Sequence, residues 1–76
     1  MRITYDPEAD ALYIQFRAIK PVRGVDLEEG VTADLDAAGH VVGIEVLDAK
    51  ERLGESIDSI TFERLAQAAQ EQAVAR

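Results

Sequence analysis

Strict alternation of apolar and polar residues is the feature that most restricts how this chain can fold. Residues 11–17 read ALYIQFR and residues 41–47 read VVGIEVL. A period of two places successive side chains on opposite faces of a β-strand. The two stretches therefore predict strands that turn one apolar side inward. The inward side chains are Leu12, Ile14, Phe16, Val42, Ile44 and Val46.

Three weaker alternating stretches and the turns between them predict further strands at residues 2–5, 22–27 and 31–36. Between the first two strands stands DPEAD, where Pro7 suits a turn because its φ is fixed. Asp6 is expected to accept backbone N–H groups just downstream, and Asp10 to support entry into the next strand. This acidic run is therefore interpreted as a structural turn.

Two glycines carry structural meaning in the middle of the chain. Residues 36–40, DAAGH, predict a hairpin loop in which Gly39 takes the left-handed backbone conformation. Gly43 lies inside the following strand, where the missing side chain leaves room for another element to approach closely. The lone histidine, His40, is interpreted as a turn residue of this hairpin.

The C-terminal third loses strand alternation and changes to a helical pattern. A short helical turn is expected to begin near Asp48 and to end at Gly54. A longer helix is expected over about 61–75, because Phe62, Leu65 and several alanines recur at helical spacing. The chain is thus predicted to be one small α+β domain, residues 1–76. Its two layers are an antiparallel β-meander of about four to five strands, able to curl, and a C-terminal α-helix.

A chain of 76 residues can build only a small core, and it has no cysteine to add a disulfide. Association into a homodimer is the expected remedy. Apolar or amphipathic residues on the second sheet face and on the C-terminal helix supply candidate contacts. These interaction residues are Tyr13, Val41, Leu47, Phe62 and Leu65.

The formal charge of −7 is concentrated in residues 25–58, which hold ten acidic and two basic residues, a net charge of −8. Such a field repels phosphate backbones and disfavours nucleic-acid binding. It suits solubility, a small basic protein partner or divalent cations. The one basic cluster, Arg17, Lys20 and Arg23, keeps a nucleic-acid binder open as a second alternative.

Carboxylates are the only side chains that offer chemistry here. Asp34 and Asp36 are expected on one sheet face, with Glu45 near them across the hairpin. Three carboxylates could hold a divalent metal, so a metal-binding protein or carboxylate-dependent enzyme is the first alternative. No glycine-rich phosphate loop or Ser-His arrangement is present, so no catalytic residue and no cofactor are predicted.

The stretches YDPEADALYIQF and DLDAAGHVVGIEVLDA together resemble the domain-of-unknown-function family 2283, a group of small prokaryotic proteins. The resemblance covers about residues 1–53 and leaves the C-terminal helix outside. It implies no activity, although small proteins of this kind are sometimes suspected of pairing with a toxin-like protein. The matching residues are Tyr5, Asp6, Asp10, Leu12, Tyr13, Ile14, Asp36, Gly39, Val42, Gly43, Ile44, Glu45, Val46, Leu47, Asp48 and Ala49.

These patterns favour a non-catalytic protein-interaction module, in its most concrete form an antitoxin-like partner of a small basic protein. The opening MRITYD lacks the basic and apolar regions of a secretory signal, and no apolar run is long enough for a membrane helix. A cytoplasmic protein is therefore expected.

Overall fold

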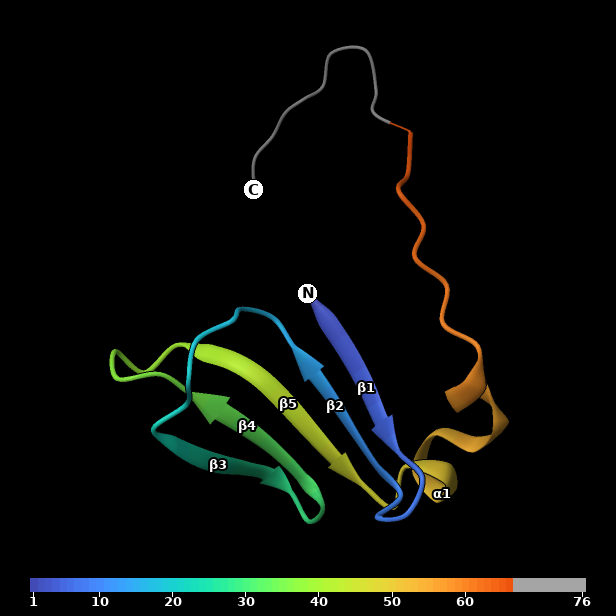
Figure 1. The fold of residues 1–76 in the computed structure, drawn as a ribbon, viewed down its shortest axis with the longest axis horizontal. Helices are drawn as coiled ribbons and strands as arrows, with labels where there is room; N and C mark the ends of the chain where they lie inside the picture. Colours follow the sequence, from blue (N-terminus) through green and yellow to red (C-terminus); the bar gives the residue numbers. More distant parts are fainter. Residues whose placement is uncertain (67–76) are drawn as a thin grey trace.

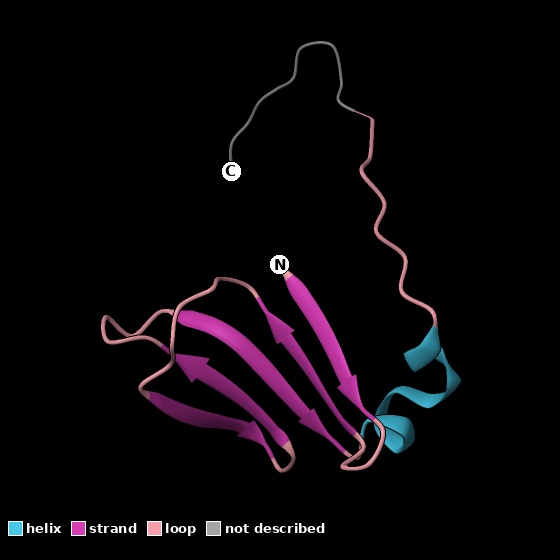
Figure 2. Cartoon of the chain, in the orientation of Figure 1, coloured by secondary structure: helices cyan, strands magenta, loops and turns pink. Residues whose placement is uncertain are grey.

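The computed structural model describes residues 1–66, except the side chains of residues 55 and 56, and it contains a single sheet followed by short helical turns (Figures 1 and 2). This confirms the predicted α+β class with an antiparallel sheet of five strands and a short helix after it. The elements are β1 Arg2–Asp6, β2 Ala11–Gln15, β3 Arg23–Glu28, β4 Val31–Leu35, β5 Val41–Leu47, the helix α1 Ala49–Leu53 and the 3-10 helix η1 Gly54–Asp58.

The strands lie in the order β1-β2-β5-β4-β3, and every neighbouring pair is antiparallel. β3, β4 and β5 follow one another as a meander, whereas β2 pairs with β5 and not with β3. Residues 16–22 therefore cross from β2, past β5 and β4 in the strand order, to β3 at the far edge of the sheet (Figure 1). The sequence indicated the strands but not this order, because alternation reports which face a residue occupies and not which strand lies beside it.

The cross-strand register sorts the side chains into rows that run across all five strands. One row is purely apolar, and we call its side of the sheet the apolar face. The next row lies on the opposite side, which we call the polar face. The apolar row is Ile3, Ile14, Ile44, Ala33 and Val25, and the polar row is Thr4, Tyr13, Glu45, Thr32 and Asp26.

The short helices cover only one end of the apolar face. Ala49 of α1 and Ile57 of η1 pack with Leu12, and Tyr5, Ile14 and Val46 lie against this cluster. Away from it the face stays partly open, since Ile3, Phe16 and Val25 are each 38% exposed. The sheet therefore has an apolar side that its own described residues do not cover completely.

The expected long helix is wrong over residues 61–66, which contain no helix or strand, and residues 67–76 lie outside the described part of the chain. Phe62 and Leu65 are 84% and 76% exposed, so the apolar stripe buries nothing there. Most of the stability of a protein helix comes from packing such a stripe against a core. Helical spacing in the sequence was not sufficient without that contact.

Candidate functional site: a polar sheet face and an extended C-terminal segment

Tyr13 organises the centre of the polar face. Its ring lies over Gly43 of β5, the position where a close approach was expected, and its hydroxyl donates a hydrogen bond of 2.9 Å to Asp34 Oδ2 on β4. Burial, followed by this hydrogen bond to a carboxylate, raises the pKa of Tyr13 above its ordinary value. The tyrosine is thus held as a neutral, ordered ring among acidic neighbours.

Three carboxylates share the polar face with Tyr13, on the three successive strands that lie to one side of β2. Asp26, Asp34 and Glu45 share the polar face, and Asp26 accepts a hydrogen bond of 3.1 Å from the Thr32 hydroxyl. In the described residues 1–66, the ion pairs that form are Arg17–Asp36 and Arg52–Glu28, so these three carboxylates have no cationic side chain against them. Arg2 lies on the same face near Tyr13 and Gln15, so the polar face carries a net negative charge that this one cation offsets only in part.

The carboxylates proposed as metal ligands do not meet in one place. Asp34 and Glu45 share the polar face, but Asp36 lies beyond the end of β4 in the hairpin turn. There it forms an ion pair of 2.7 Å with Arg17, and it accepts the backbone N–H groups of Ala38 and His40. No group of three His, Asp or Glu side chains within the described part of the chain could hold a metal ion.

The hairpin turn accounts for Asp36, Gly39 and His40 without any chemistry. Gly39 has φ 89°, the left-handed conformation that the sequence predicted. Hydrogen bonds from the backbone N–H groups of His40 and Ala38 lower the pKa of the Asp36 carboxyl. They outweigh burial, which acts in the opposite direction. The Arg17 guanidinium, drawn from the predicted basic cluster, also lowers this pKa and is engaged by this contact.

The β1–β2 turn confirms Asp6 as a structural residue and gives Asp10 a larger role than expected. Asp6 Oδ1 accepts the N–H groups of Glu8 and Ala9, as an Asx-type turn requires. Asp10, with φ 53°, accepts the Tyr5 hydroxyl at 2.7 Å and the backbone N–H of Lys50 at 3.1 Å. Asp10 therefore caps the N-terminal end of α1, although it lies forty residues earlier in the sequence.

Sequence reasoning missed this cap because the contact spans forty residues and local patterns do not record it. Asp48 precedes α1 but makes no side-chain capping bond, so Asp10 supplies the acceptor instead. Arg52 was missed for the same reason. It pairs with Glu28 at 2.8 Å and also donates to the carbonyls of Leu47 and Glu29, tying α1 to the β3–β4 turn.

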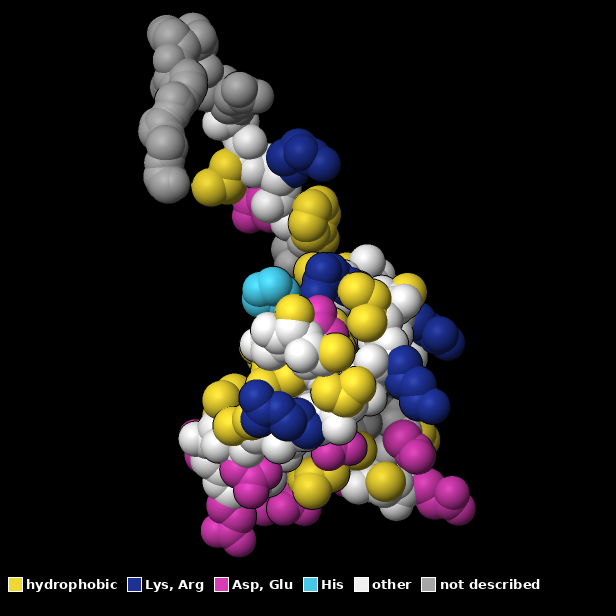
Figure 3. Space-filling model, turned by 90° about the vertical axis from the view of Figure 1, so that its left-hand side faces the viewer, with side chains coloured by type: hydrophobic (Ala, Val, Ile, Leu, Met, Phe, Trp, Pro, Cys, Tyr) yellow, Lys and Arg dark blue, Asp and Glu magenta, His cyan; other side chains and the backbone are white. Residues whose placement is uncertain are grey.

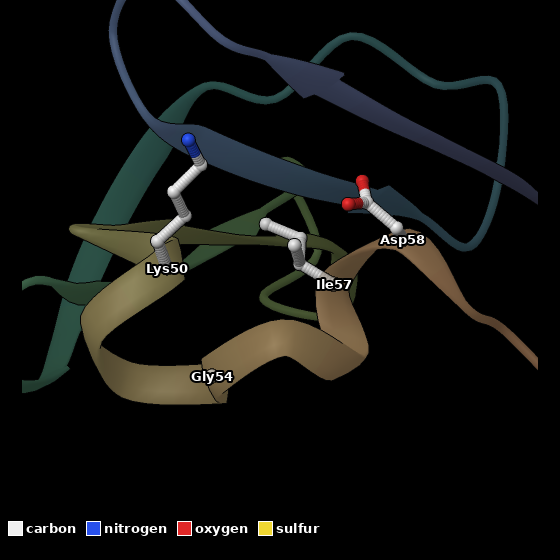
Figure 4. Close-up of a pocket in the computed structure, with 4 residues that line it drawn as sticks. All are labelled: Lys50, Gly54, Ile57 and Asp58. Carbon is white, nitrogen blue, oxygen red and sulfur yellow. The ribbon is translucent and has the colours of Figure 1, made fainter.

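A pocket of about 500 Å³ lies between the α1–η1 arch and the sheet, lined by Lys50, Gly54, Ile57 and Asp58 (Figure 4). Ile57 points from the arch towards the strands, and Lys50 and Asp58 stand on either side of it. Since Ile57 belongs to the core cluster, the floor of the pocket is the covered end of the apolar face. The chain leaves this end towards its C-terminus.

The predicted interaction residues separate into two places. Tyr13 and Leu47 lie on the polar face, Val41 begins β5, and both Val41 and Leu47 are 41% exposed. Phe62 and Leu65 lie on residues 59–66, which we call the C-terminal segment. It runs away from the sheet after η1 (Figure 1).

Acidic side chains gather at one end of the molecule, seen at the bottom of Figure 3. This is the end at which the β1–β2 and β3–β4 turns lie, and Glu28 and Glu29 belong to the latter turn. Lys and Arg side chains lie higher in this view, separated by apolar ones. The described part of the chain has no helix long and apolar enough to cross a membrane.

Together these features define a small α+β domain with one partly open apolar sheet face and one acidic polar face. Residues 2–50 match the family described as protein of unknown function (DUF2283), and the chain belongs to this family. The match includes the whole sheet and the Tyr13–Asp34–Gly43 contact. No curated protein and no solved structure matches the chain.

Proposed function

We infer that this chain is a non-catalytic interaction module of the cytoplasm whose polar face binds a small basic protein. The observation that supports this most directly is that Asp26, Asp34 and Glu45 share the polar face with Tyr13 and form no ion pair within the described residues. Carboxylates that share one face of a sheet repel one another. A cationic partner would remove that repulsion.

The chemistry of the face suits a protein more than a small molecule. The exposed rows combine an ordered tyrosine, the apolar Leu47 and carboxylates, a mixture typical of protein interfaces. A negative face also accelerates encounter with a positive partner, and added salt screens this effect. An antitoxin-like pairing with a basic toxin is the most concrete form of the proposal.

The test is capture of partners by the tagged chain from extracts of its own host, followed by mass spectrometry. The captured protein is then purified, and its affinity is measured at increasing salt. We expect a small basic protein whose affinity falls with salt. Capture of the chain alone, or only of neutral or acidic proteins, would contradict the proposal.

A charge-neutral variant locates the binding surface. Asp26→Asn, Asp34→Asn and Glu45→Gln combined should abolish binding of the captured protein. The matched control, Glu8→Gln, Glu51→Gln and Glu63→Gln, removes the same charge from exposed positions outside the polar face. Equal loss in both triple variants would show that only net charge matters and would overturn the assignment to this face.

A further inference from the structure

The apolar face is closed at its middle and partly open at its two edges, since Ala33 is 4% exposed whereas Ile3 and Val25 are each 38% exposed. Its row of Ile3, Ile14, Ile44, Ala33 and Val25 contains no charged residue and crosses all five strands. The α1–η1 arch packs only at the Leu12 end, which leaves Ile3 and Val25 open at the two edges. Apolar surface left open at both edges of the same face offers a contact site.

The C-terminal segment has the complementary feature, apolar side chains without a surface beneath them. Ile60, Phe62 and Leu65 are 61%, 84% and 76% exposed. Residues 59–76 carry Glu63, Glu71, Arg64 and Arg76, so their formal charge is zero in a chain of net charge −7. This stretch can therefore approach another copy without the repulsion that the acidic regions would cause.

The dimensions of the segment and the face agree. The seven extended steps from Ser59 to Ala66 span about 24 Å. Four spacings between five strands span about 19 Å. The segment is thus long enough to cross the apolar row from edge to edge.

The direction of the segment favours a second copy as the source of the cover. Residues 59–66 leave their own arch and rise clear of their own sheet in two perpendicular views (Figures 1 and 3). We propose that two copies form a homodimer in which the C-terminal segment of each seats Ile60, Phe62 and Leu65 on the apolar face of the other. This two-fold exchange uses the face opposite the proposed partner surface and does not depend on it.

Light scattering and sedimentation of the full chain provide the first test. The wild type should be a dimer, and Phe62→Ser combined with Leu65→Ser should raise its dissociation constant roughly ten-thousandfold, since the two-fold dimer loses four large apolar side chains and each accounts for about tenfold. Leu27→Ser is the matched control, because Leu27 is 59% exposed at the bulge of β3 and lies outside the apolar row. A monomeric wild type, or a dimer unaffected by the double change, would overturn the proposal.

Cysteine cross-linking tests the exchange directly, because the natural chain has no cysteine. One preparation carries Val25→Cys and another Phe62→Cys, and the mixture is treated with a short bis-maleimide. A covalent heterodimer is expected, and Thr4→Cys on the polar face in place of Val25→Cys should give none. Equal yield with Thr4→Cys would overturn the proposal. So would a product that forms only within one chain carrying both Val25→Cys and Phe62→Cys, since the segment would then cover its own sheet.

Discussion

Tyr13 and Gly43 occupy neighbouring strands so closely that the tyrosine ring fills the space of the missing glycine side chain. A methyl group built on Gly43 would come within 2.6 Å of Tyr13 Cζ. The ring crosses β5 in this way, and its hydroxyl reaches Asp34 on β4. One side chain thereby links three strands on the polar face.

Replacing Gly43 by alanine should lower the free energy of unfolding by about 1–3 kcal/mol, because the added methyl group overpacks the site and displaces the Tyr13 ring. Urea unfolding of purified variants measures this change. In a Tyr13→Ala background, the same Gly43→Ala change should cost much less, since the ring is gone. An equal cost in both backgrounds would refute the contact as its cause.

Asp10→Ala should lower the free energy of unfolding by about 2–4 kcal/mol. The change removes acceptors for the Tyr5 hydroxyl and the Lys50 N–H, and it leaves alanine at a left-handed φ of 53°. Asp10→Asn keeps an acceptor and tolerates that φ, so it should cost less than half as much. Thermal and urea unfolding compare the three proteins, and equal losses in both variants would count against the cap.

Asp48→Gly should raise the free energy of unfolding by up to about 1 kcal/mol. Asp48 also has a left-handed backbone, with φ 52°, but its side chain makes no capping bond that glycine would lose. The free energy of unfolding should therefore rise in Asp48→Gly and fall in Asp10→Ala. The first change only relieves backbone strain, whereas the second also removes hydrogen bonds. A destabilised Asp48→Gly protein would show that the Asp48 side chain has a structural role.

The folded protein should lose stability as pH rises from about 10 to about 12. The hydrogen bond to Asp10, followed by burial, raises the pKa of Tyr5 to about 12 from an ordinary value of 10.0. A raised native pKa means that the folded state retains the proton, so its stabilising effect is complete below pH 10 and is lost as pH rises through the native value. Phenolate absorbance should show a late titration step near pH 12 that is lost in Tyr5→Phe, whereas the raised titration of Tyr13 remains. A wild-type curve that matches free tyrosine would contradict the Tyr5–Asp10 bond.

The stabilising effect of Asp36 should be lost at acid pH, in contrast to that of Tyr5. Because hydrogen bonding by the His40 N–H lowers its pKa, Asp36 stabilises the fold at neutral pH and loses this effect as pH falls through the native value. The stability difference between wild type and Asp36→Asn should therefore shrink on acidification. Arg17→Gln should lose only part of the stability that Asp36→Asn loses, since the backbone N–H groups of the turn still bind Asp36. A difference independent of pH would contradict this account.

The strands and hairpins were predictable because their determinants are local. Alternation around Leu12 and Ile44 placed β2 and β5, and Gly39 marked the hairpin that joins β4 to β5. Gly43 even indicated a close contact, although the sequence did not identify Tyr13 as the residue in it. The apolar–polar alternation and the turn residues can be recognised in the sequence without knowing which distant residues they contact.

The remaining features depend on contacts between distant parts of the chain. Asp10 meets Lys50, and Glu28 meets Arg52, through a strand order that alternation does not encode. The three candidate metal ligands do not come together, because β4 ends at Leu35. Asp36 therefore lies in the turn and not on the polar face with Asp34 and Glu45. The helix over 61–75 was inferred from spacing alone, whereas packing decides whether such spacing becomes a helix.

The central pairing of β2 with β5 also sets the order of events during synthesis. Ala11 of β2 pairs with Leu47 of β5, so the sheet cannot close until that residue has left the ribosomal exit tunnel. Until then β1 and β2 form at most an isolated hairpin, which is marginal in water. The nascent chain thus emerges with the β5 edge of β2 unpaired, and that edge stays open until β5 arrives.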